Sequence, residues 1–375
     1  MPNFDRRLIT NFDWLLFGLV ILISVIGIVT IYSATRPAIE TGVHPDFYLK
    51  QILWLVISII ALFVVVFFDY IWLHRFSFIL YGCGILLLII VLVAGKATMG
   101  AQRWLNLGFM SFQPSEMFKI VFIIALSAYL SNRGETQLKS IPVKSLIFFF
   151  VIPVLLIIKQ PDLGTAVLIM FLFVILLLSK GLSRKIVVMA LVIGLISAPF
   201  IGHVGWNSLK DYQKNRIIAF MDPDIDPSGI GYHINQSKIT IGSGGLTGKG
   251  YLKGTQGALR FLPEKHTDFI FSVFAEEWGF LGSLLLVGIY LVLFLRGLNT
   301  ALLAKDEFGR LVATGITAMF FIYFLVNIGM TLGMMPVVGV PMPFMSYGGT
   351  ALLSNFIAAG ILINIRTRRF QLFYP

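Results

Sequence analysis

The sequence predicts an all-α membrane protein that crosses the bilayer about ten times. Hydrophobic residues make up 57% of its 375 residues, whereas soluble proteins usually contain roughly 45 to 50%. Charged residues make up only 13%, which is about half the usual share. The apolar residues are also grouped in long runs. This composition excludes a disordered chain, a collagen, a coiled coil and an ordinary cytosolic enzyme.

Each predicted crossing is a run of apolar residues. A helix needs about 20 such residues to cross the hydrocarbon core, and somewhat fewer where it is short or broken. Ten runs qualify: residues 14–33, 49–68, 76–94, 115–131, 145–158, 163–179, 186–202, 269–295, 311–332 and 347–365. The first run resembles a signal peptide but is too long and lacks a cleavage site, so we expect an uncleaved anchor. We expect residues 1–375 to form one integral membrane domain.

The distribution of positive charge predicts that both ends of the chain are cytoplasmic. Ten crossings leave both ends on one side, and Lys and Arg collect in cytoplasmic loops. In the tails and short loops, 15 Lys and Arg fall on the side of the termini. The opposite side holds five: Arg36, Lys50, Lys96, Arg103 and Lys159. Topology thus explains the net charge of +11, and nucleic-acid binding is not expected.

The one long connection, residues 203–268, is expected on the extracytoplasmic side between the seventh and eighth helices. A loop of this length in a compact protein is usually functional. Residues 211–221 place apolar side chains on one helical face and charges on the other, which suits a helix in the membrane interface. Residues 222–231 are rich in turn formers, residues 232–241 suit a second short helix, and residues 242–250 form a flexible glycine stretch.

Familiar ligand-binding patterns fail in these polar segments. The glycine stretch has Ser243 where a Walker A loop needs its first glycine, and Thr247 where a dinucleotide fold needs its third. Three nearby aspartates have calcium-loop spacing, but Pro227 replaces the required glycine. The five histidines show no zinc spacing, and the single cysteine, Cys83, excludes an intramolecular disulfide. We therefore expect no nucleotide site.

Charged residues at the ends of the apolar runs are functional candidates, since a charge at mid-bilayer costs about 2.5 to 3.5 kcal/mol. Glu116 and Lys119 lie three residues apart and share a helix face. They are interpreted equally well as a self-neutralising ion pair and as functional groups. Asp162, in the segment QPDLGT, suits an N-cap of the sixth helix, alone or together with a functional role.

Asp268 stands at the most highly charged helix entrance of the chain. It directly precedes the eighth run, so a purely capping role is one interpretation. Lys265 and His266 come just before it, and the pair Glu276 and Glu277 follows two turns later.

The predicted topology brings several polar segments to the outer ends of their helices. They are Arg103, residues 113–119, residues 160–165, Asp268 and residues 346–349. The last belongs to a segment rich in proline and glycine, residues 335–349, which suits a broken or re-entrant segment shaping a cavity. The cations at this rim are Arg103, Lys119, Lys253, Arg260 and Lys265. A lipid pyrophosphate suits such a site, because Arg and Lys clamp phosphate oxygens and stabilise a phosphate leaving group.

These segments together resemble the shape, elongation, division and sporulation (SEDS) family. The matching motifs are RWLNLG from Arg103, QPSEMFK from Gln113, QPDLGT from Gln160, GSGGLTGKG from Gly242, LPEKHTDFIFSVFAEEWGF from Leu262 and GMTLGMMPVVGVPMPFMSYGGT from Gly329. The resemblance spans nearly the whole chain. QPDLGT, AEEWG and MPVVGVP are closer to the RodA branch of the elongation machinery than to the FtsW branch of the division machinery. At position 50 this sequence has Lys where Arg is common in the family, and the two side chains bind phosphate differently. At position 342 it has Met where Leu is common in the family.

The resemblance implies a peptidoglycan glycosyltransferase that polymerises lipid II during cell elongation and rod-shape maintenance. Such an enzyme acts at the outer face of the bacterial plasma membrane. The resemblance also implies a class B penicillin-binding protein, a transpeptidase, as partner near the eighth and ninth spans. A divalent cation, Mg or Mn, is implied as well, and its oxygen ligands leave little sequence signature.

The family's essential aspartate corresponds to Asp268. As general base, it would take the proton of the acceptor GlcNAc 4-hydroxyl while undecaprenyl pyrophosphate leaves the donor MurNAc with inversion. A helix N-terminus weakens a carboxylate as a base, so orienting the acceptor or holding the cation are alternative roles. Substrate binding is assigned to Arg103, Gln113, Ser115, Glu116, Lys119, Asp162, Thr165, Lys265, His266, Ser346 and Tyr347.

Two other functions stay open from the sequence. Broken helices and intramembrane charges also occur in transporters, which here would mean a lipid II flippase. Against it, the candidate residues gather at the outer face rather than at the midplane. A non-catalytic scaffold of the wall-synthesis machinery would use Asp268 only as a cap, and it predicts that Asp268→Asn is tolerated.

Overall fold

The computed structural model describes residues 10–40, 46–98, 101–106, 111–133, 143–181, 211–222, 229–255 and 266–370. Within these ranges, seven helices are long and apolar enough to cross a membrane. They are α2 (Trp14–Glu40), α3 (Phe47–Phe67), α4 (Ile71–Ala94), α5 (Pro114–Ser131), α13 (Ile270–Leu302), α14 (Glu307–Thr331) and α15 (Gly349–Thr367). Two shorter apolar helical segments are Ile147–Lys159 and Leu163–Ser179.

Nine of the ten predicted runs coincide with these helices, and the tenth, residues 186–202, lies outside the described residues. Several helices extend beyond their apolar runs, three of them by five residues or more. Helix α2 continues to Glu40, α4 begins at Ile71 rather than at residue 76, and α13 continues to Leu302. Hydropathy marks only the length inside the bilayer, whereas a helix can continue into the polar region beyond it.

The fifth run is not a regular α-helix. It consists of α6 (Val143–Leu146), a π-helical segment η2 (Ile147–Val151) and α7 (Ile152–Lys159). Pro153 lies two residues beyond the end of the π-helical segment, and proline both lacks an N–H and clashes with the preceding turn. The wider π turn accommodates this break without ending the helix. Helix α8 (Leu163–Ser179) then follows after a short turn.

A small sheet departs from the expected all-helical fold, so that prediction was wrong in this segment. Strands β1 (Lys96–Thr98), β2 (Ala101–Asn106) and β3 (Ser111–Phe112) form an antiparallel sheet in that order. Lys96 pairs with Trp104, and Leu105 pairs with Phe112. These strands lie between two apolar runs, and a hydropathy search treats such a polar connection as a loop. In the structure, the strands pair with one another, and this pairing satisfies the hydrogen bonding of their backbone N–H and C=O groups.

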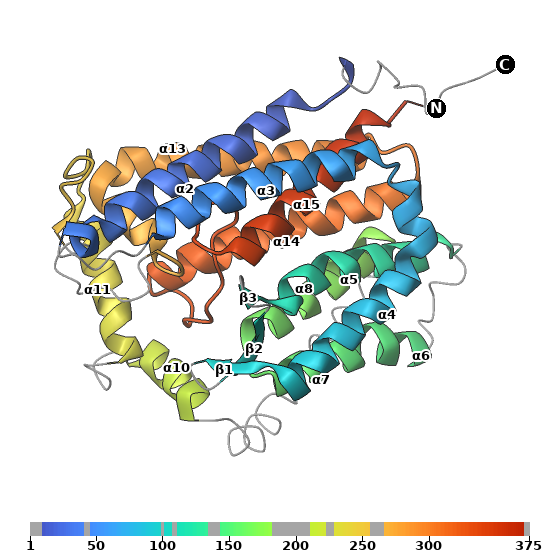
Figure 1. The fold of residues 1–375 in the computed structure, drawn as a ribbon, viewed down its shortest axis with the longest axis horizontal. Coiled ribbons are helices and arrows are strands. Elements are labelled where there is room, and N and C mark those ends of the chain that lie inside the picture. The colour runs from blue at the N-terminus through green and yellow to red at the C-terminus, as the bar shows by residue number, and fades with distance from the viewer. Residues whose placement is uncertain are drawn as a thin grey trace.

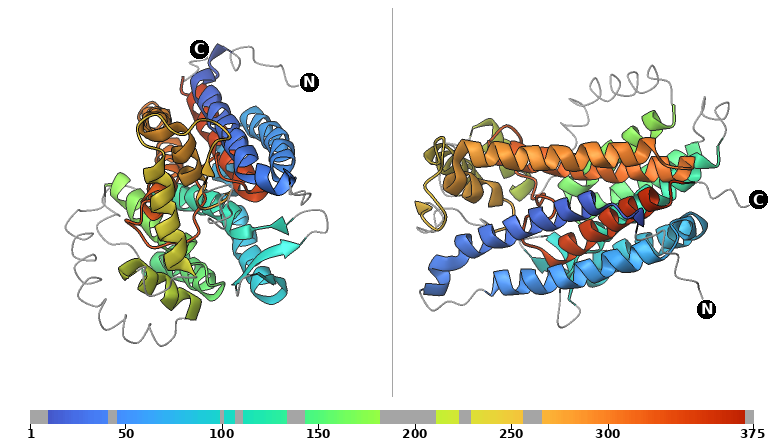
Figure 2. Two further views of the ribbon diagram at one scale, coloured as in Figure 1. Left: turned by 90° about the vertical axis from the view of Figure 1, so that its left-hand side faces the viewer. Right: turned by 90° about the horizontal axis from the view of Figure 1, so that it is seen from above.

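The long helices run roughly alongside one another in two groups (Figure 1). Helices α2, α3, α13, α14 and α15 form one group, and α4, α5, α7 and α8 form the other. The start of α2 and the end of α15 lie at the same end of the bundle, where Arg366 is 3.1 Å from Asp13. Helices α10 (Asp211–Met221) and α11 (Ile230–Ser243) lie at the opposite end (Figure 2). Both short loop helices were predicted, α10 with the same bounds.

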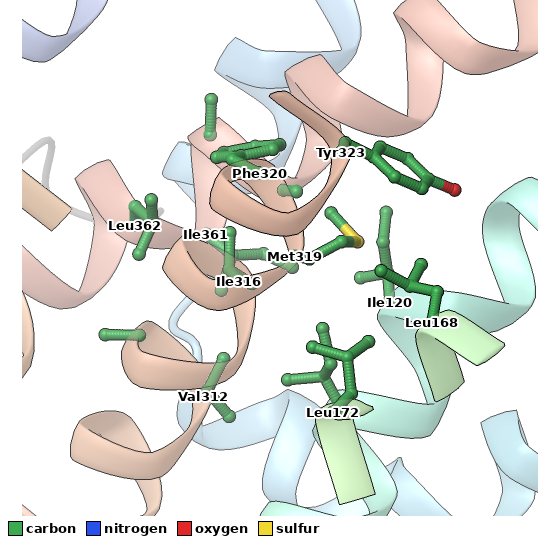
Figure 3. Close-up of a cluster of buried hydrophobic side chains, with 14 of the residues drawn as sticks. Ile120, Leu168, Leu172, Val312, Ile316, Met319, Phe320, Tyr323, Ile361 and Leu362 are labelled. Atoms are coloured by element: carbon green, nitrogen blue, oxygen red, sulfur yellow. The ribbon is translucent and has the colours of Figure 1, made fainter. Parts of the chain in front are cut away.

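Helix α14 is a member of the first group that packs against the second, and its side chains fill the core. Figure 3 shows its apolar side chains packed between those of α5 and α8 on one side and those of α15 on the other. The labelled residues of α14 are Val312, Ile316, Met319, Phe320 and Tyr323, at the three- and four-residue spacing of a buried helix face. A short turn, residues 303–306, joins α13 to α14.

The outer helices expose large apolar side chains. Leu53 on α3, Ile79 on α4 and Leu285 on α13 are more than half exposed. A soluble monomer rarely exposes an apolar surface of this extent. Together with the apolar lengths of the helices, this surface identifies a multi-pass membrane protein.

Candidate functional site

The start of α8 binds an arginine from the small sheet. Asp162 is the N-cap of α8 and accepts hydrogen bonds from the Thr165 N–H at 3.3 Å and the Thr165 hydroxyl at 3.0 Å. The predicted capping role of Asp162 is therefore confirmed. Arg103, on β2, has its guanidinium 3.8 Å from the Asp162 carboxylate and also donates to the Pro161 carbonyl. The sheet thus holds a cation against the cap of α8.

Glu116 and Lys119 form a buried ion pair on α5. Their charged atoms are 2.7 Å apart, which confirms the predicted pair. The Lys119 ammonium also lies 4.2 Å from the ring centre of Tyr323 on α14. The Tyr323 hydroxyl is 3.5 Å from Glu116. Asp162 adds to the attraction on Lys119, so two cations and two carboxylates balance one another in this part of the molecule.

The first turn of α5 also carries two uncharged candidates. Gln113 occupies the N-cap position, and Pro114 follows it at the first helical position, as is common. The Gln113 side-chain amide donates to the Ser115 hydroxyl at 3.1 Å. Ser115 is buried and Gln113 is half-buried.

Asp268 is half-buried in the turn that precedes α13. Helix α13 begins at Ile270, and Phe269 occupies its N-cap position. Asp268 therefore lies one residue outside the position that the sequence suggested. Its backbone carbonyl accepts a hydrogen bond at 3.0 Å from the side-chain amide of Asn327, on α14.

A non-helical segment between α14 and α15 passes beside Asp268, as the proline and glycine pattern predicted. Gly339 has a φ of +72°, and a Cβ added there would lie 3.5 Å from Oδ2 of Asp268. A Cβ added to Gly164, on α8, would lie 3.1 Å from the Val338 carbonyl oxygen. The broken segment therefore lies against both Asp268 and the start of α8.

Aromatic side chains gather around His266. Its ring stacks on Phe47 at 4.4 Å, and Phe47 meets the ring of Tyr347 edge to face at 4.9 Å. The Tyr347 N–H donates to the His266 carbonyl at 2.9 Å. The neighbouring Ser346 hydroxyl donates to the Thr267 carbonyl at 2.7 Å.

The glycine stretch has a different role from the flexibility that was predicted. Its backbone lies on α13 where that helix kinks at Gly279, which has a φ of +66°. The Phe280 N–H donates to the Gly245 carbonyl at 2.8 Å, and the Lys249 N–H donates to the Glu276 carbonyl at 3.0 Å. A Cβ on Gly248 would collide with the Glu277 carbonyl. These glycines therefore permit a close backbone contact.

Glu276 and Glu277 hold the glycine stretch and the residues that follow it. Glu276 accepts hydrogen bonds from the Lys249 ammonium at 2.7 Å and from the Thr255 N–H at 2.8 Å. Glu277 accepts one from the Leu252 N–H at 3.2 Å. Both carboxylates are buried. They are thus part of the packing of the outer loop.

The structure places eleven of the twelve predicted site residues in the groups described above. Lys265 and Arg260 lie outside the described residues. Sequence reasoning missed Gln51, Tyr323 and Asn327. Gln51 and Asn327 are buried amides within apolar runs, and a polar group there is expensive unless it is hydrogen-bonded. That cost is a signal that could have singled them out.

Known proteins are similar to this chain in sequence and in fold. A profile of the FtsW/RodA/SpoVE family, described as cell cycle protein, matches residues 13–371. The peptidoglycan glycosyltransferase MrdB of Escherichia coli K12 is 46% identical over 77% of this chain and 77% of that protein. The peptidoglycan glycosyltransferase RodA of Treponema pallidum is 33% identical over 97% of this chain and 99% of that protein.

Two solved structures are similar over nearly their full lengths. One is a chain from a study of the structural coordination of polymerization and crosslinking by a peptidoglycan synthase complex. It has a TM-score of 0.81 at 30% identity and covers 96% of this chain and 99% of its own. The other is the rod shape determining protein RodA of Thermus thermophilus, with a TM-score of 0.71 at 29% identity, over 96% and 98% of the two chains.

Proposed function

The chain belongs to the FtsW/RodA/SpoVE family of cell cycle proteins, and from this membership we propose its reaction and the roles of its residues. Like the relatives named above, it is a peptidoglycan glycosyltransferase. Its substrate in this proposal is lipid II, which it polymerises during cell elongation and rod-shape maintenance. The observation that carries the site assignment is that α14 contacts both Lys119, through Tyr323, and the backbone of Asp268, through Asn327.

Asp268 acts as the general base in this proposal. Its carboxylate takes the proton of the acceptor GlcNAc 4-hydroxyl, and that oxygen forms a bond to the anomeric carbon of the donor MurNAc. The bond from this carbon to the pyrophosphate breaks, and undecaprenyl pyrophosphate leaves with the electron pair. Direct displacement inverts the anomeric carbon. A base must lie within hydrogen-bond reach of the proton that it takes, and Asp268 is half-buried, so part of the residue is exposed.

The charged group on β2, α5 and α8 binds the pyrophosphate in this proposal. Arg103 is held 3.8 Å from Asp162, an ion pair loose enough to be exchanged for a phosphate oxygen. Lys119 stabilises the charge that develops on the leaving group. The polar groups beside them, Gln113, Ser115, Glu116 and Thr165, orient these cations and the substrate. Lys265, His266, Ser346 and Tyr347 belong to the acceptor side, next to Asp268.

A divalent cation, Mg or Mn, fits this donor set only in part. Among the described residues, no three His, Cys, Asp or Glu side chains are grouped as a metal cage. Mg²⁺ is often held by one or two carboxylates, water and substrate phosphates. In the alternative to the base role, the half-buried Asp268 would be such a single carboxylate ligand, together with phosphate oxygens of the substrate. A bound cation would supply charge neutralisation at the pyrophosphate.

The chain is a multi-pass membrane protein, and we place its active site on the extracytoplasmic side of the bacterial plasma membrane. The partner in this proposal is a class B penicillin-binding protein. Support comes from the similar chain that belongs to a peptidoglycan synthase complex. Exposed apolar side chains on α13, such as Leu281 and Leu285, suit contact with a membrane helix.

The experiment is polymerisation of labelled lipid II by purified protein with its penicillin-binding partner and a divalent cation. Asp268→Asn should abolish glycan strands while lipid II binding persists. Asp306→Asn is the matched control, because Asp306 caps α14 and bonds the Gly309 N–H at 2.7 Å, away from Asp268. Full activity of Asp268→Asn would refute the base assignment. Lipid II flipping without polymerisation by wild type would favour the transporter instead.

A further inference from the structure

Two buried amides connect the turn of Asp268 to the membrane helices. Three consecutive carbonyls, those of His266, Thr267 and Asp268, each accept a hydrogen bond from a different group. We call these donors the carbonyl clamp: the Tyr347 N–H at 2.9 Å, the Ser346 hydroxyl at 2.7 Å and the Asn327 amide at 3.0 Å. We propose that Asn327 and Gln51 are positioning residues that fix Asp268 through this clamp. The inference rests on the proposed function, in which Asp268 is the base.

The carbonyl clamp fixes the position of the Asp268 Cα, from which the side chain extends. Each hydrogen bond fixes the orientation of one peptide plane, because the carbonyl oxygen lies in that plane. Three fixed planes in succession leave little freedom to the backbone on both sides of the Asp268 Cα. The Asp268 side chain then extends from a backbone whose position is fixed. Such preorganisation matters, since a displacement of about 1 Å can cost roughly 100-fold in rate.

Asn327 is the donor to Asp268, and its orientation is unambiguous. Its Nδ2 donates to the Asp268 carbonyl at 3.0 Å and to the Val340 carbonyl at 2.9 Å. If its oxygen and nitrogen were exchanged, the side-chain oxygen would face the two carbonyl oxygens, and no donor would lie between these three acceptors. The side chain is 0% exposed, and its amide is used by these two backbone carbonyls. Its effect on the reaction must pass through Asp268 and through the broken segment at Val340.

Gln51 holds the other half of the clamp from α3. Its amide donates to the Ser346 carbonyl at 3.1 Å, and its carbonyl oxygen accepts from the Gly348 N–H at 3.2 Å. The Ser346 hydroxyl is itself used twice, because it also accepts from the Met342 N–H at 2.8 Å. Gln51 therefore fixes the two residues, Ser346 and Tyr347, that donate to the turn of Asp268.

The test compares two buried asparagines in otherwise equal settings. Asn364, on α15, is 1% exposed, and its amide also donates to two carbonyls, those of Val65 and Phe68. Those carbonyls belong to the C-terminal end of α3, outside the clamp. Asn327→Asp and Asn364→Asp each replace a donor by a carboxylate of nearly the same shape. Any general cost of burying the new group is therefore common to both variants.

We expect Asn327→Asp to lower kcat for lipid II polymerisation about 10- to 100-fold, with little change in KM or in lipid II binding. Asn364→Asp should keep a near wild-type kcat per folded enzyme. Equal losses of kcat in the two variants would overturn the positioning role. Failure of the partnered wild type to polymerise would instead overturn the proposed function, and this inference with it.

Hydrogen exchange tests the carbonyl clamp without any activity. The amide of Tyr347 is protected by its bond to the His266 carbonyl. Gln51→Glu removes the donor to Ser346 and should speed exchange in the peptide that contains Tyr347, and Asn327→Asp should speed exchange in the residues after Asp268. Asn364→Asp should leave both peptides unchanged. Unchanged exchange in both clamp variants would overturn the clamp, even in an active enzyme.

Discussion

Tyr323 and Asn327 lie one helical turn apart on α14, and each contacts a different part of the site. The Tyr323 ring lies 4.2 Å from the Lys119 ammonium, and the Asn327 amide lies 3.0 Å from the Asp268 carbonyl oxygen. Four residues of α-helix span about 6 Å along the axis. Helix α14 thus sets the spacing between the cation assigned to the leaving group and the base assigned to the acceptor.

Variants of the Glu116 and Lys119 ion pair can separate an effect on stability from an effect on activity. Glu116→Gln leaves the Lys119 charge buried without its carboxylate and should lower the free energy of unfolding by about 3 to 5 kcal/mol. The double variant Glu116→Gln with Lys119→Met removes both charges and should recover much of that stability. Thermal unfolding in detergent measures both effects. The double variant should nevertheless fail to polymerise lipid II, and an active double variant would exclude a role for Lys119 in the reaction.

The ring of Tyr323 should matter more than its hydroxyl. Tyr323→Phe keeps the cation–π contact with Lys119 and loses only a long 3.5 Å contact with Glu116. Tyr323→Leu loses the aromatic face, whose interaction with a buried cation is worth about 2 kcal/mol. We therefore expect near wild-type polymerisation from Tyr323→Phe and a loss of roughly 10- to 30-fold from Tyr323→Leu. The reverse order would show that the hydroxyl is the functional group.

Gly339→Ala should slow the reaction beyond its effect on stability. Gly339 has a φ of +72°, and the new methyl group would lie 3.5 Å from Oδ2 of Asp268. Gly245→Ala is the control, because Gly245 also has a positive φ, +56°, but has no atom within 4 Å of an added Cβ. Both variants should lose about 1 kcal/mol to backbone strain. Only Gly339→Ala should lose kcat in addition, as measured on lipid II at matched folded fractions.

The contact between the glycine stretch and α13 predicts a large difference between two glycines. A Cβ on Gly248 would collide with the Glu277 carbonyl, whereas one on Gly242 would have no atom within 4 Å. Gly248→Ala should destabilise the protein by about 2 to 3 kcal/mol, the range of severe steric substitutions. Gly242→Ala should be neutral or slightly stabilising in helix α11. Limited proteolysis of the outer loop and thermal unfolding should rank the two variants in this order, and equal behaviour would argue against the contact.

The sequence predicted best those features that depend on neighbours along the chain. Apolar runs located the membrane helices, the spacing of Glu116 and Lys119 predicted their ion pair, and the position of Asp162 before α8 predicted its cap. Features that depend on distant residues were missed. The Asn327 bond to Asp268 joins residues 59 apart, and the Gln51 bond to Ser346 joins residues 295 apart. The roles of the site residues in the reaction stay predictions.

The bond between Asn327 and Asp268 also closes a ring through the chain. Helices α13 and α14 are joined at one end by the short turn of residues 303–306 and at the other end by this hydrogen bond. A hairpin fastened at both ends resists sliding of one helix along the other. A lateral force on the outer surface of α13 would therefore tilt or translate the two helices together. The turn of Asp268 and the ring of Tyr323 would then move together relative to α5 and α8.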